Sequence, residues 1–261
     1  MAIVNVTPDS FADGGERFDP DVAIADATRM VADGADILDI GGESTRPGAG
    51  TLPDAEEWRR VAPVLEGVRG LGVPISIDTY KASIADRAID LGASIVNDIS
   101  ALVYEPALAD VVARRGAALI LMHNRGRSRE MYAEAKYADV AGEVTAELAQ
   151  RVAAAERAGI RRDRLLVDPG LGFAKRAEHT YAALAGLPRL AALGLPIVSG
   201  PSRKSFLKIA VGDVPPAARV WGTAAAVAAS ILLGAHIVRV HDVKAMVDVA
   251  RTADALRATG P

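Results

Sequence analysis

Polar side chains recur near the ends of short apolar runs throughout this chain of 261 residues. If the runs are parallel strands, residues two apart share a face and the polar ends meet at one edge. Such a gathering of carboxylates, amides and cations predicts a binding site rather than a packing motif. The residues concerned are Asn5, Asp39 with Glu43, Asp78, Asn97, His123, Asp168, Ser199 with Lys204, and Arg239 with His241.

The deeper members of this set carry no positive charge. Asp78, Asn97 and Asp168 offer carboxylate and amide groups, which suit a planar heterocycle with an amidine-like N–H edge. Met122 and Phe173 could cover the two faces of such a ring, although Met and Phe at these positions more often belong to a core. The pattern favours a flat polar ring bound deep in the fold.

Cations are concentrated near the C-terminal end. Arg203 and Lys204 are adjacent in the segment SGPSRKS, and Arg239 and His241 follow the next apolar run, in RVHD. Guanidinium groups pair well with phosphate oxygens. In α/β barrels, phosphate sites frequently follow strands seven and eight, at a helix N-terminus. We therefore expect an anion site near the rim.

Two long loops rich in glycine, proline and polar residues follow strands. The first, 7–18, lies in NVTPDSFADGG, whose Asn5 and Asp13 are hard oxygen ligands of the kind that suits Mg²⁺ together with a substrate phosphate. The second, 41–53, contains GGESTRPG and could close on an oxyanion through Arg46. Loops of this length are usually functional lids, so we expect both to be mobile without ligand.

Several of the candidates have a structural interpretation. Asp39 is favoured as a buried carboxylate satisfied by its neighbours, and Glu43 as a residue that orients the following loop. For His123 a core role and a site role remain equally open. His179 and His236 belong to no motif and are expected to be structural or exposed.

The elements that would position these residues alternate from one end of the chain to the other, as short β-branched runs and longer amphipathic stretches. Eight such units predict a single-domain α/β fold, a (β/α)₈ TIM barrel spanning 1–261. An open doubly wound sheet is the alternative, but it would normally show fewer strands or a dinucleotide-binding turn. The expected strands are 2–6, 37–40, 74–78, 94–98, 117–123, 164–168, 195–200 and 236–241, and the clearest helices are 21–33, 56–69, 83–91, 140–158 and 217–233.

Glycine marks the joints between helices and following strands. Beyond a helix end, glycine adopts the left-handed conformation at little cost. The expected positions are Gly34, Gly92, Gly116, Gly159 and Gly234.

Composition excludes several classes of function. The formal net charge of −3 and the absence of a basic stripe argue against a nucleic-acid partner. Cysteine is absent, which removes disulfides, thiolate metal sites and a cysteine nucleophile. No stretch reaches the length of a membrane span, and the N-terminus, which runs almost directly into the first strand, resembles no secretory signal. We expect a cytoplasmic protein whose barrel floor lacks an N-terminal plug.

The motifs together resemble those of the dihydropteroate synthase family of pterin-binding enzymes across essentially the whole chain. They are NVTPDSFADGG, GGESTRPGA, IDTYKA, NDIS, LMH, DPGLGFAK, GPSRKSF and RVHDV, in family order. The resemblance implies that 4-aminobenzoate is joined to 6-hydroxymethyl-7,8-dihydropterin diphosphate, giving 7,8-dihydropteroate and pyrophosphate for folate synthesis.

The resemblance also implies roles for individual residues. The pterin pocket would comprise Asp78, Asn97, Met122, Asp168, Phe173, Gly200 and Lys204, and the aminobenzoate slot Phe11, Thr45, Arg46, Pro47, Phe173, Ser202 and Lys204. The diphosphate would lie against Asn5, Thr45, Arg239 and His241. Asp78, Lys204, Arg239 and His241 are the expected catalytic residues, and Mg²⁺ the expected cofactor, bound by Asn5 and Asp13.

Two other functions remain open. A non-catalytic pterin-binding paralogue would keep the fold without turnover, and a corrinoid-linked methyltransferase would use the pocket without a diphosphate site. The resemblance further implies a homodimer, for which the alanine-rich stretch 223–233 could serve, although this helix could equally be buried within one chain.

Overall fold

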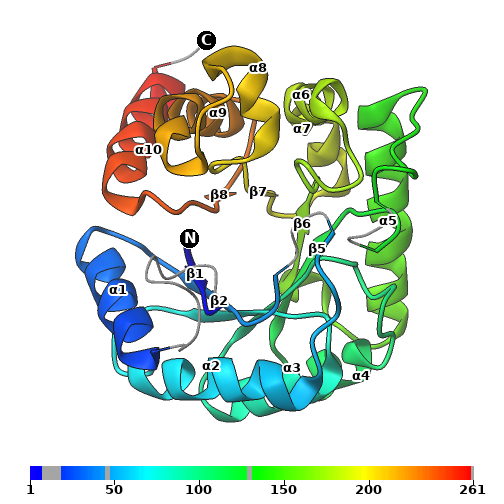
Figure 1. Cartoon of the computed structure of the whole chain (residues 1–261). Coiled ribbons are helices and arrows are strands. Elements are labelled where there is room, and N and C mark those ends of the chain that lie inside the picture. The colour runs from blue at the N-terminus through cyan, green and yellow to red at the C-terminus, as the bar shows by residue number, and fades with distance from the viewer. Residues whose placement is uncertain (8–18, 45–47, 128–130, 260–261) are drawn as a thin grey trace.

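In the computed structural model, which describes residues 1–7, 19–44, 48–127 and 131–259, parallel strands lie at the centre and helices surround them (Figure 1). The strands are β1 (Ala2–Asn5), β2 (Leu38–Gly41), β3 (Ile75–Asp78), β4 (Ile95–Asp98), β5 (Ala118–Met122), β6 (Leu165–Asp168), β7 (Val198–Ser199) and β8 (Ile237–Val238). The helices are α1 (Pro20–Ala32), α2 (Asp54–Val68), α3 (Ala82–Asp90), α4 (Leu108–Arg115), α5 (Val140–Arg157), α6 (Ala177–Ala185), α7 (Leu187–Leu190), α8 (Lys208–Val211), α9 (Val220–Leu232) and α10 (Val243–Ala258).

The strands form a closed ring. Strands β1 to β6 pair in chain order and β7 pairs with β8, all in parallel. A bridge between Val167 and Ile197 joins β6 to β7, and a bridge between Ala2 and Val240 joins β8 to β1. Because both edges are joined, the fold is the predicted TIM barrel, and the open-sheet alternative is wrong.

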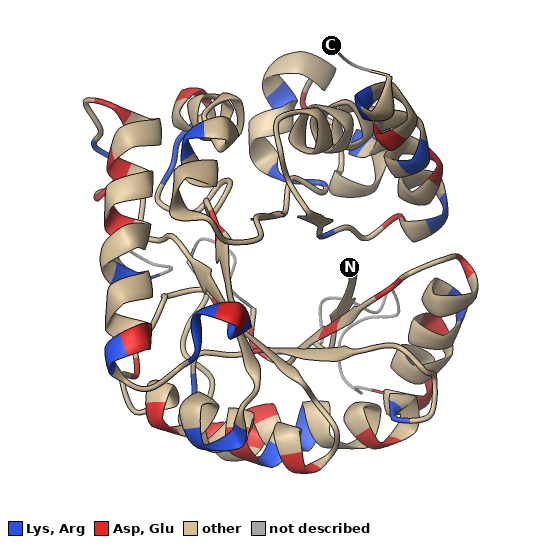
Figure 2. Ribbon diagram, turned by 180° about the vertical axis from the view of Figure 1, so that it is seen from behind, with Lys and Arg blue, Asp and Glu red and all other residues tan. Residues whose placement is uncertain are grey.

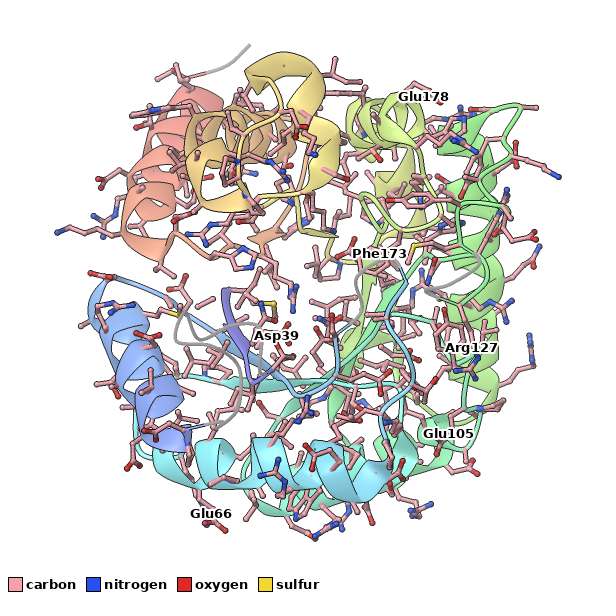
Figure 3. The ribbon with its side chains drawn as sticks, viewed as in Figure 1. Asp39, Glu66, Glu105, Arg127, Phe173 and Glu178 are labelled. Atoms are coloured by element: carbon pink, nitrogen blue, oxygen red, sulfur yellow. The ribbon has the colours of Figure 1, made fainter. Side chains whose placement is uncertain are left out.

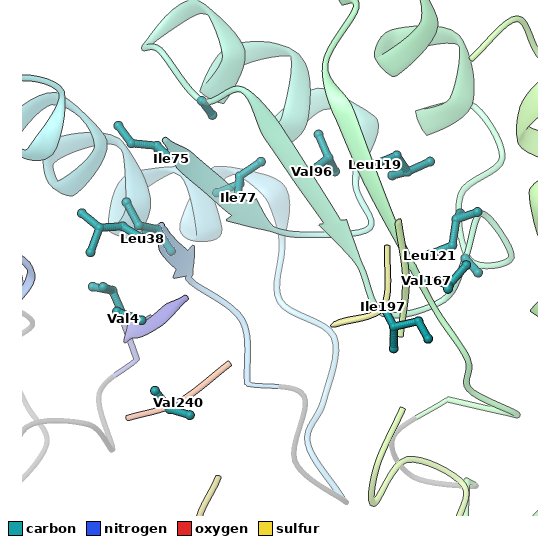
Figure 4. Packing of buried hydrophobic residues seen from close by; sticks show 14 of the residues in the cluster. Val4, Leu38, Ile75, Ile77, Val96, Leu119, Leu121, Val167, Ile197 and Val240 are labelled. Carbon is teal, nitrogen blue, oxygen red and sulfur yellow. The ribbon is translucent and has the colours of Figure 1, made fainter. Parts of the chain in front are cut away.

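Alternation along the strands separates two apolar layers. Outward residues such as Leu38, Ile77 and Val96 pack against the helices in one large core (Figure 4). Inward residues form a smaller cluster inside the ring, in which Ile120 and Val198 are fully buried. The apolar cluster therefore fills much of the interior at this level, and most of the polar inward side chains lie nearer the strand ends.

The last two strands are shorter than expected. Strand β7 is confined to Val198–Ser199, between Pro196 and Pro201, which have no N–H to donate to a sheet ladder. The ladder continues irregularly beyond β8, where the Arg239 N–H donates to Ser199 O at 2.9 Å. The irregular backbone places the segments 199–205 and 239–242 side by side, as the anion-site hypothesis requires.

The five predicted glycine joints are confirmed. Each has a positive φ, from 67° at Gly116 to 105° at Gly92 and Gly234. Charged side chains lie mainly on the outer helices and on the loops, and the strands carry few of them (Figure 2). Among the described helices, none combines the length and apolarity that crossing a membrane requires.

Gly116 tests the backbone contribution of these joints. It ends α4 with φ 67° and ψ 20°, and an added Cβ would meet no atom within 4 Å. Gly116→Ala should therefore cost about 1–2 kcal/mol of unfolding free energy through backbone strain alone. Gly70→Ala is the matched control, since its surroundings are equally open and its φ is not positive. Urea denaturation of both variants measures the difference, and equal stability would contradict this account.

Candidate active site

An arginine from the last strand crosses the mouth of the barrel to two carboxylates from the second and third strands. The Arg239 guanidinium donates to Asp39 Oδ2 at 2.5 Å and to Asp78 Oδ2 at 2.7 Å. Asn97 Nδ2 also donates to Asp39 Oδ2, at 3.1 Å. The four side chains therefore form one hydrogen-bonded group across the barrel mouth.

Strand register explains why these residues meet. Asp78 on β3 lies opposite Asn97 on β4, and Met122 on β5 lies opposite Asp168 on β6. Side chains at paired positions of parallel strands point to the same face, here the barrel interior. Gly41 makes room for this group, because a Cβ there would lie 3.2 Å from Asp78 Cβ.

A second charged group faces the first. Lys204 Nζ donates to Leu171 O and lies 4.6 Å from the centre of the Phe173 ring. Asp168, which accepts from the Gly170 N–H at 2.7 Å, is close enough to oppose the effect of burial on the Lys204 pKa. Figure 3 shows Asp39 and Phe173 in the central region, whereas Glu66 and Glu178 point outward from their helices.

An apolar wall borders these charges. Met122 and Ile99 are buried together with Tyr80, and Phe173 and Tyr104 pack against them. The wall and the carboxylates bring apolar faces and acidic edges together, which is the lining that the predicted flat polar ring requires.

Burial sets the charge states of the site. It raises the pKa of Asp78 to about 7 against the opposing effect of Arg239, and it also raises the pKa of Asp168. It lowers the pKa of Lys204 to about 8, and Asp168 opposes that change. Asp78 and Lys204 consequently titrate near neutrality, where a ligand or a reaction step can shift their protons.

The predicted diphosphate residues form a neighbouring group at the junction of β8 and β1. Ser202 Oγ lies 2.9 Å from His241 Nδ1. Asn5, Arg203 and His241 line a cavity of about 460 Å³ at this junction. Burial, together with the charges of Arg203 and Arg239, lowers the pKa of His241 to about 3, so the imidazole is neutral at pH 7.

Some of the predicted residues fall outside the described structure. Phe11, Asp13, Thr45, Arg46 and Pro47 lie in the segments 8–18 and 45–47, so their placement and the mobility of both loops stay predictions.

The predicted role of Glu43 is confirmed. It accepts from the Leu52 N–H at 3.0 Å and from Lys81 Nζ at 2.8 Å, and so fixes the end of the loop 41–53.

Two expectations near strand seven are wrong. Ser199 does not face the mouth, because its hydroxyl lies 2.9 Å from that of Ser230 on α9. The expected helix N-terminus is a 3₁₀ turn, Ser205–Leu207, followed by a four-residue helix. Arg203 lines the cavity with His241, but its guanidinium is also paired with Asp242 at 2.5 Å, and its role in the anion site stays a prediction.

The structural interpretations of the other residues are mostly confirmed. Asp39 is fully buried and paired, but within the described residues its Oδ1 has no partner, so its neighbours satisfy it only in part. His123 is a buried residue bonded to Lys175 and Glu147. His236 is exposed and accepts from the Ile197 N–H. The other partner of His123, Lys175, ends the motif DPGLGFAK, but no pattern in the sequence marked it as a candidate.

Comparison with known proteins identifies the family to which this fold belongs. Residues 1–241 match the model of a family described as pterin binding enzymes. A dihydropteroate synthase from Synechocystis sp. is 46% identical over 257 residues, which cover 98% of this chain and 89% of the relative. The chain belongs to the dihydropteroate synthase family.

Solved structures of other dihydropteroate synthases extend the likeness to three dimensions. The enzyme of Xanthomonas albilineans with 4-aminobenzoic acid is 43% identical, with a TM-score of 0.92 over 99% of this chain and 93% of that one. The same enzyme in complex with 7,8-dihydropteroate has a TM-score of 0.89, with 41% identity and the same coverage. The likeness therefore covers the whole barrel and not one motif.

The depressed pKa of His241 predicts a pH effect on stability. The unfolded imidazole has a pKa near 6.5 and the folded one near 3, so its contribution is full above pH 6.5 and is lost as pH falls toward 3. Lowering the pH from 7 to 5 should reduce the unfolding free energy of both chains, but the reduction should be about 1–2 kcal/mol smaller in His241→Asn than in the parent chain. Urea denaturation at the two pH values measures this, and parallel losses would show that the imidazole is not forced to stay neutral.

Proposed function

We propose that this chain joins 4-aminobenzoate to 6-hydroxymethyl-7,8-dihydropterin diphosphate, releasing pyrophosphate and forming 7,8-dihydropteroate. The observation that carries the proposal is the arrangement of Asp78 with the buried side chains of Asn97 and Asp168 beside the cations Arg239 and Lys204. A pocket for an apolar ligand would not need three acidic or amide groups at its edge. A site for an anion alone would not need the carboxylates. The product complex of the Xanthomonas albilineans relative supports the same reaction.

The pterin would bind by its polar edge in the deeper part of the pocket. Asp168 and Asn97 are each 5% exposed, so a hydrogen bond to either would be formed in a nearly dry site. A hydrogen bond to an ionised carboxylate, as at Asp168, is stronger than one between neutral groups. Met122 and Phe173 would cover the faces of the ring, and Gly200, which lies against Lys204 Nζ and Arg239 Cβ, would leave space for it.

The diphosphate would lie toward β8 and β1, against Arg239, His241, Asn5 and Thr45. Burial opposes the charge of Arg239, but Asp39 and Asp78 more than compensate, so its pKa stays above the usual value. Arg239 is therefore a permanent cation for the leaving group. A phosphate dianion beside the ring would oppose burial and the charges of Arg203 and Arg239, which hold the His241 pKa low, so His241 would gain a proton more easily.

The reaction is a substitution at the pterin methylene with dissociative character. The C–O bond to diphosphate breaks with its electron pair, and the aryl amine forms the new C–N bond and then loses a proton. Asp78 and Asp168 stabilise the positive charge that develops on the pterin, because carboxylates act strongly in a dry site. Arg239 and His241 stabilise the charge on the departing group. An aryl amine is a weak base, so no strong general base is needed.

Mg²⁺ is proposed as the cofactor, with Asn5 as one ligand and Asp13 as the other. Asn5 lies at the end of β1 and lines the cavity beside His241, and its amide oxygen is a hard donor suited to this ion. Bound there together with the diphosphate, Mg²⁺ would neutralise part of the leaving-group charge.

The aminobenzoate would lie above the pterin, against Phe11, Arg46, Pro47, Ser202 and Lys204. The loops 7–18 and 41–53 would close over it and exclude water, which would otherwise intercept the pterin cation. Of these loops the structure describes the anchored end at Leu52. A cytoplasmic location completes the proposal.

Turnover tests the reaction and the anion site together. Purified protein with the pterin diphosphate, 4-aminobenzoate and Mg²⁺ should release pyrophosphate, and omission of any component should abolish release. Arg239→Lys keeps a charge beside Asp39 but loses the paired N–H donors, so kcat/KM should fall on the order of 100-fold. Arg59→Lys, in an exposed ion pair on α2, is the matched control and should behave as the parent chain.

The possible outcomes separate the alternatives. Pterin binding without pyrophosphate release would mean a non-catalytic binding paralogue. Release that persists unchanged in Arg239→Lys would remove Arg239 from the proposed mechanism.

A homodimer formed through α8 and α9 is proposed from an exposed apolar stripe. Trp221 is 81% exposed and Leu232 50% exposed on α9, and Ile209 on α8 is 70% exposed. Helix α9 carries no charged residue, and its other face packs into the barrel. Exposed apolar side chains gathered on neighbouring helices are typical of an interface, and a second copy of the chain fits because the stripe has no charge to complement.

The stripe predicts the effect of one charge on assembly. Trp221→Glu would place a carboxylate in the interface and should give particles with the mass of one chain, where the parent chain gives two. Val22→Glu on α1 is the control at another exposed apolar residue and should leave the mass unchanged. Sedimentation or light scattering measures the masses, and a parent chain that is monomeric would refute the proposal.

A further inference from the structure

The loop that follows β6 forms part of the pterin pocket and is held in a strained conformation. Asp168 begins the turn, Phe173 faces the pocket, and Leu171 O accepts from Lys204. Ala174 is fully buried at φ 47°, a left-handed conformation that is unfavourable for a residue with a Cβ. Such a backbone persists only when its surroundings hold it there.

Lys175, directly after this turn, folds back beneath it. Its ammonium lies 2.8 Å from His123 Nδ1 and donates to Gly170 O at 3.2 Å and to Phe173 O at 3.1 Å. Burial lowers the pKa of Lys175 to about 7, and the three acceptors around its nitrogen match the three N–H donors of its protonated form. The side chain is 1% exposed, so these contacts are made without water.

The partner of His123 on α5 determines that its Nδ1 atom can accept from Lys175. His123 Nε2 lies 3.1 Å from Glu147 Oε2 on α5. Since the carboxylate can only accept, the proton of a neutral imidazole lies on Nε2 and Nδ1 is free to accept from Lys175. Burial and the charge of Lys175 lower the His123 pKa to about 4, which keeps the ring neutral.

The backbone of the turn at Gly170 is packed tightly against the backbone of His123. A Cβ at Gly170 would lie 1.9 Å from His123 O, so the backbone of the turn passes directly over β5. Tyr137, in the loop before α5, donates its hydroxyl to Ala174 O at 3.0 Å and supports the other end. Lys175 therefore holds the start of the turn at Gly170 and its pocket-facing residue at Phe173.

We propose that Lys175 is a positioning residue for the pterin, acting through the strained turn 170–174 and the Phe173 ring rather than by contact with substrate. The inference rests on the proposed function of the pocket. Without the ammonium, Gly170 O and Phe173 O lose a buried donor, and the turn relaxes from the geometry in which Phe173 covers the pterin and Leu171 O receives Lys204.

Equilibrium binding of 6-hydroxymethyl-7,8-dihydropterin, which has no leaving group, tests the proposal without turnover. Lys175→Met keeps the length of the side chain and removes its donors, and the dissociation constant should rise about tenfold. Phe173→Ala should also weaken binding. In the Phe173→Ala background, Lys175→Met should raise the dissociation constant by less than about twofold, because the ring through which Lys175 acts is gone.

The control separates positioning from general destabilisation. Leu108→Ala removes a fully buried side chain on α4, away from the turn, and should lower the melting temperature with the pterin dissociation constant unchanged. Tyr137→Phe removes only the hydroxyl on Ala174 O and should weaken pterin binding in the same direction. It keeps the test available if Lys175→Met does not fold.

Two results would overturn the proposal. One is an unchanged dissociation constant in Lys175→Met or, where that variant does not fold, in Tyr137→Phe. The other is a double variant whose dissociation constant rises by the product of the two single effects of Lys175→Met and Phe173→Ala. Failure of the parent chain to bind the pterin alcohol would instead refute the proposed function of the pocket, so the two failures are distinguishable.

Discussion

The ion pairs of Arg239 with Asp39 and Asp78 are the interaction on which the barrel mouth depends. They join β8 to β2 and β3 across the ring, where backbone pairing does not reach. A buried charge without a partner costs several kcal/mol, so each of these residues requires the others. Asp39 binds nothing in the proposed mechanism, yet it fixes the guanidinium that the diphosphate needs.

Strand alternation explains why such a network can exist in a well-packed barrel. Inward positions lower in the ring hold apolar side chains such as Ile120 and Val198, and the next inward positions hold the polar groups. The apolar layer keeps water from reaching the network from below. The same exclusion shifts the pKa values of Asp78 and Lys204 toward neutrality, so the packing of the core and the chemistry of the mouth have one cause.

Periodicity and glycine positions predicted the barrel because they report local structure. All eight strands and the five glycine joints follow from patterns within a few residues. Side-chain partners depend on the closed ring instead, which is why the pairing of Arg203 with Asp242, 39 residues away, was not predicted. The part played by Lys175 was equally hidden, since His123 is 52 residues from it. The assignments within the pocket owed as much to family resemblance as to pattern.

The protonation of the pocket carboxylates is consistent with the proposed chemistry. Burial raises the pKa of Asp78 against the opposing charge of Arg239, and the neighbouring Asp39 raises it further, so a proton or another positive charge beside Asp78 is favoured. A pterin that presents N–H donors, and that becomes cationic as the diphosphate leaves, supplies such a charge. The pocket is therefore more complementary to the developing cation than to the neutral ring, and it is this difference that accelerates a reaction.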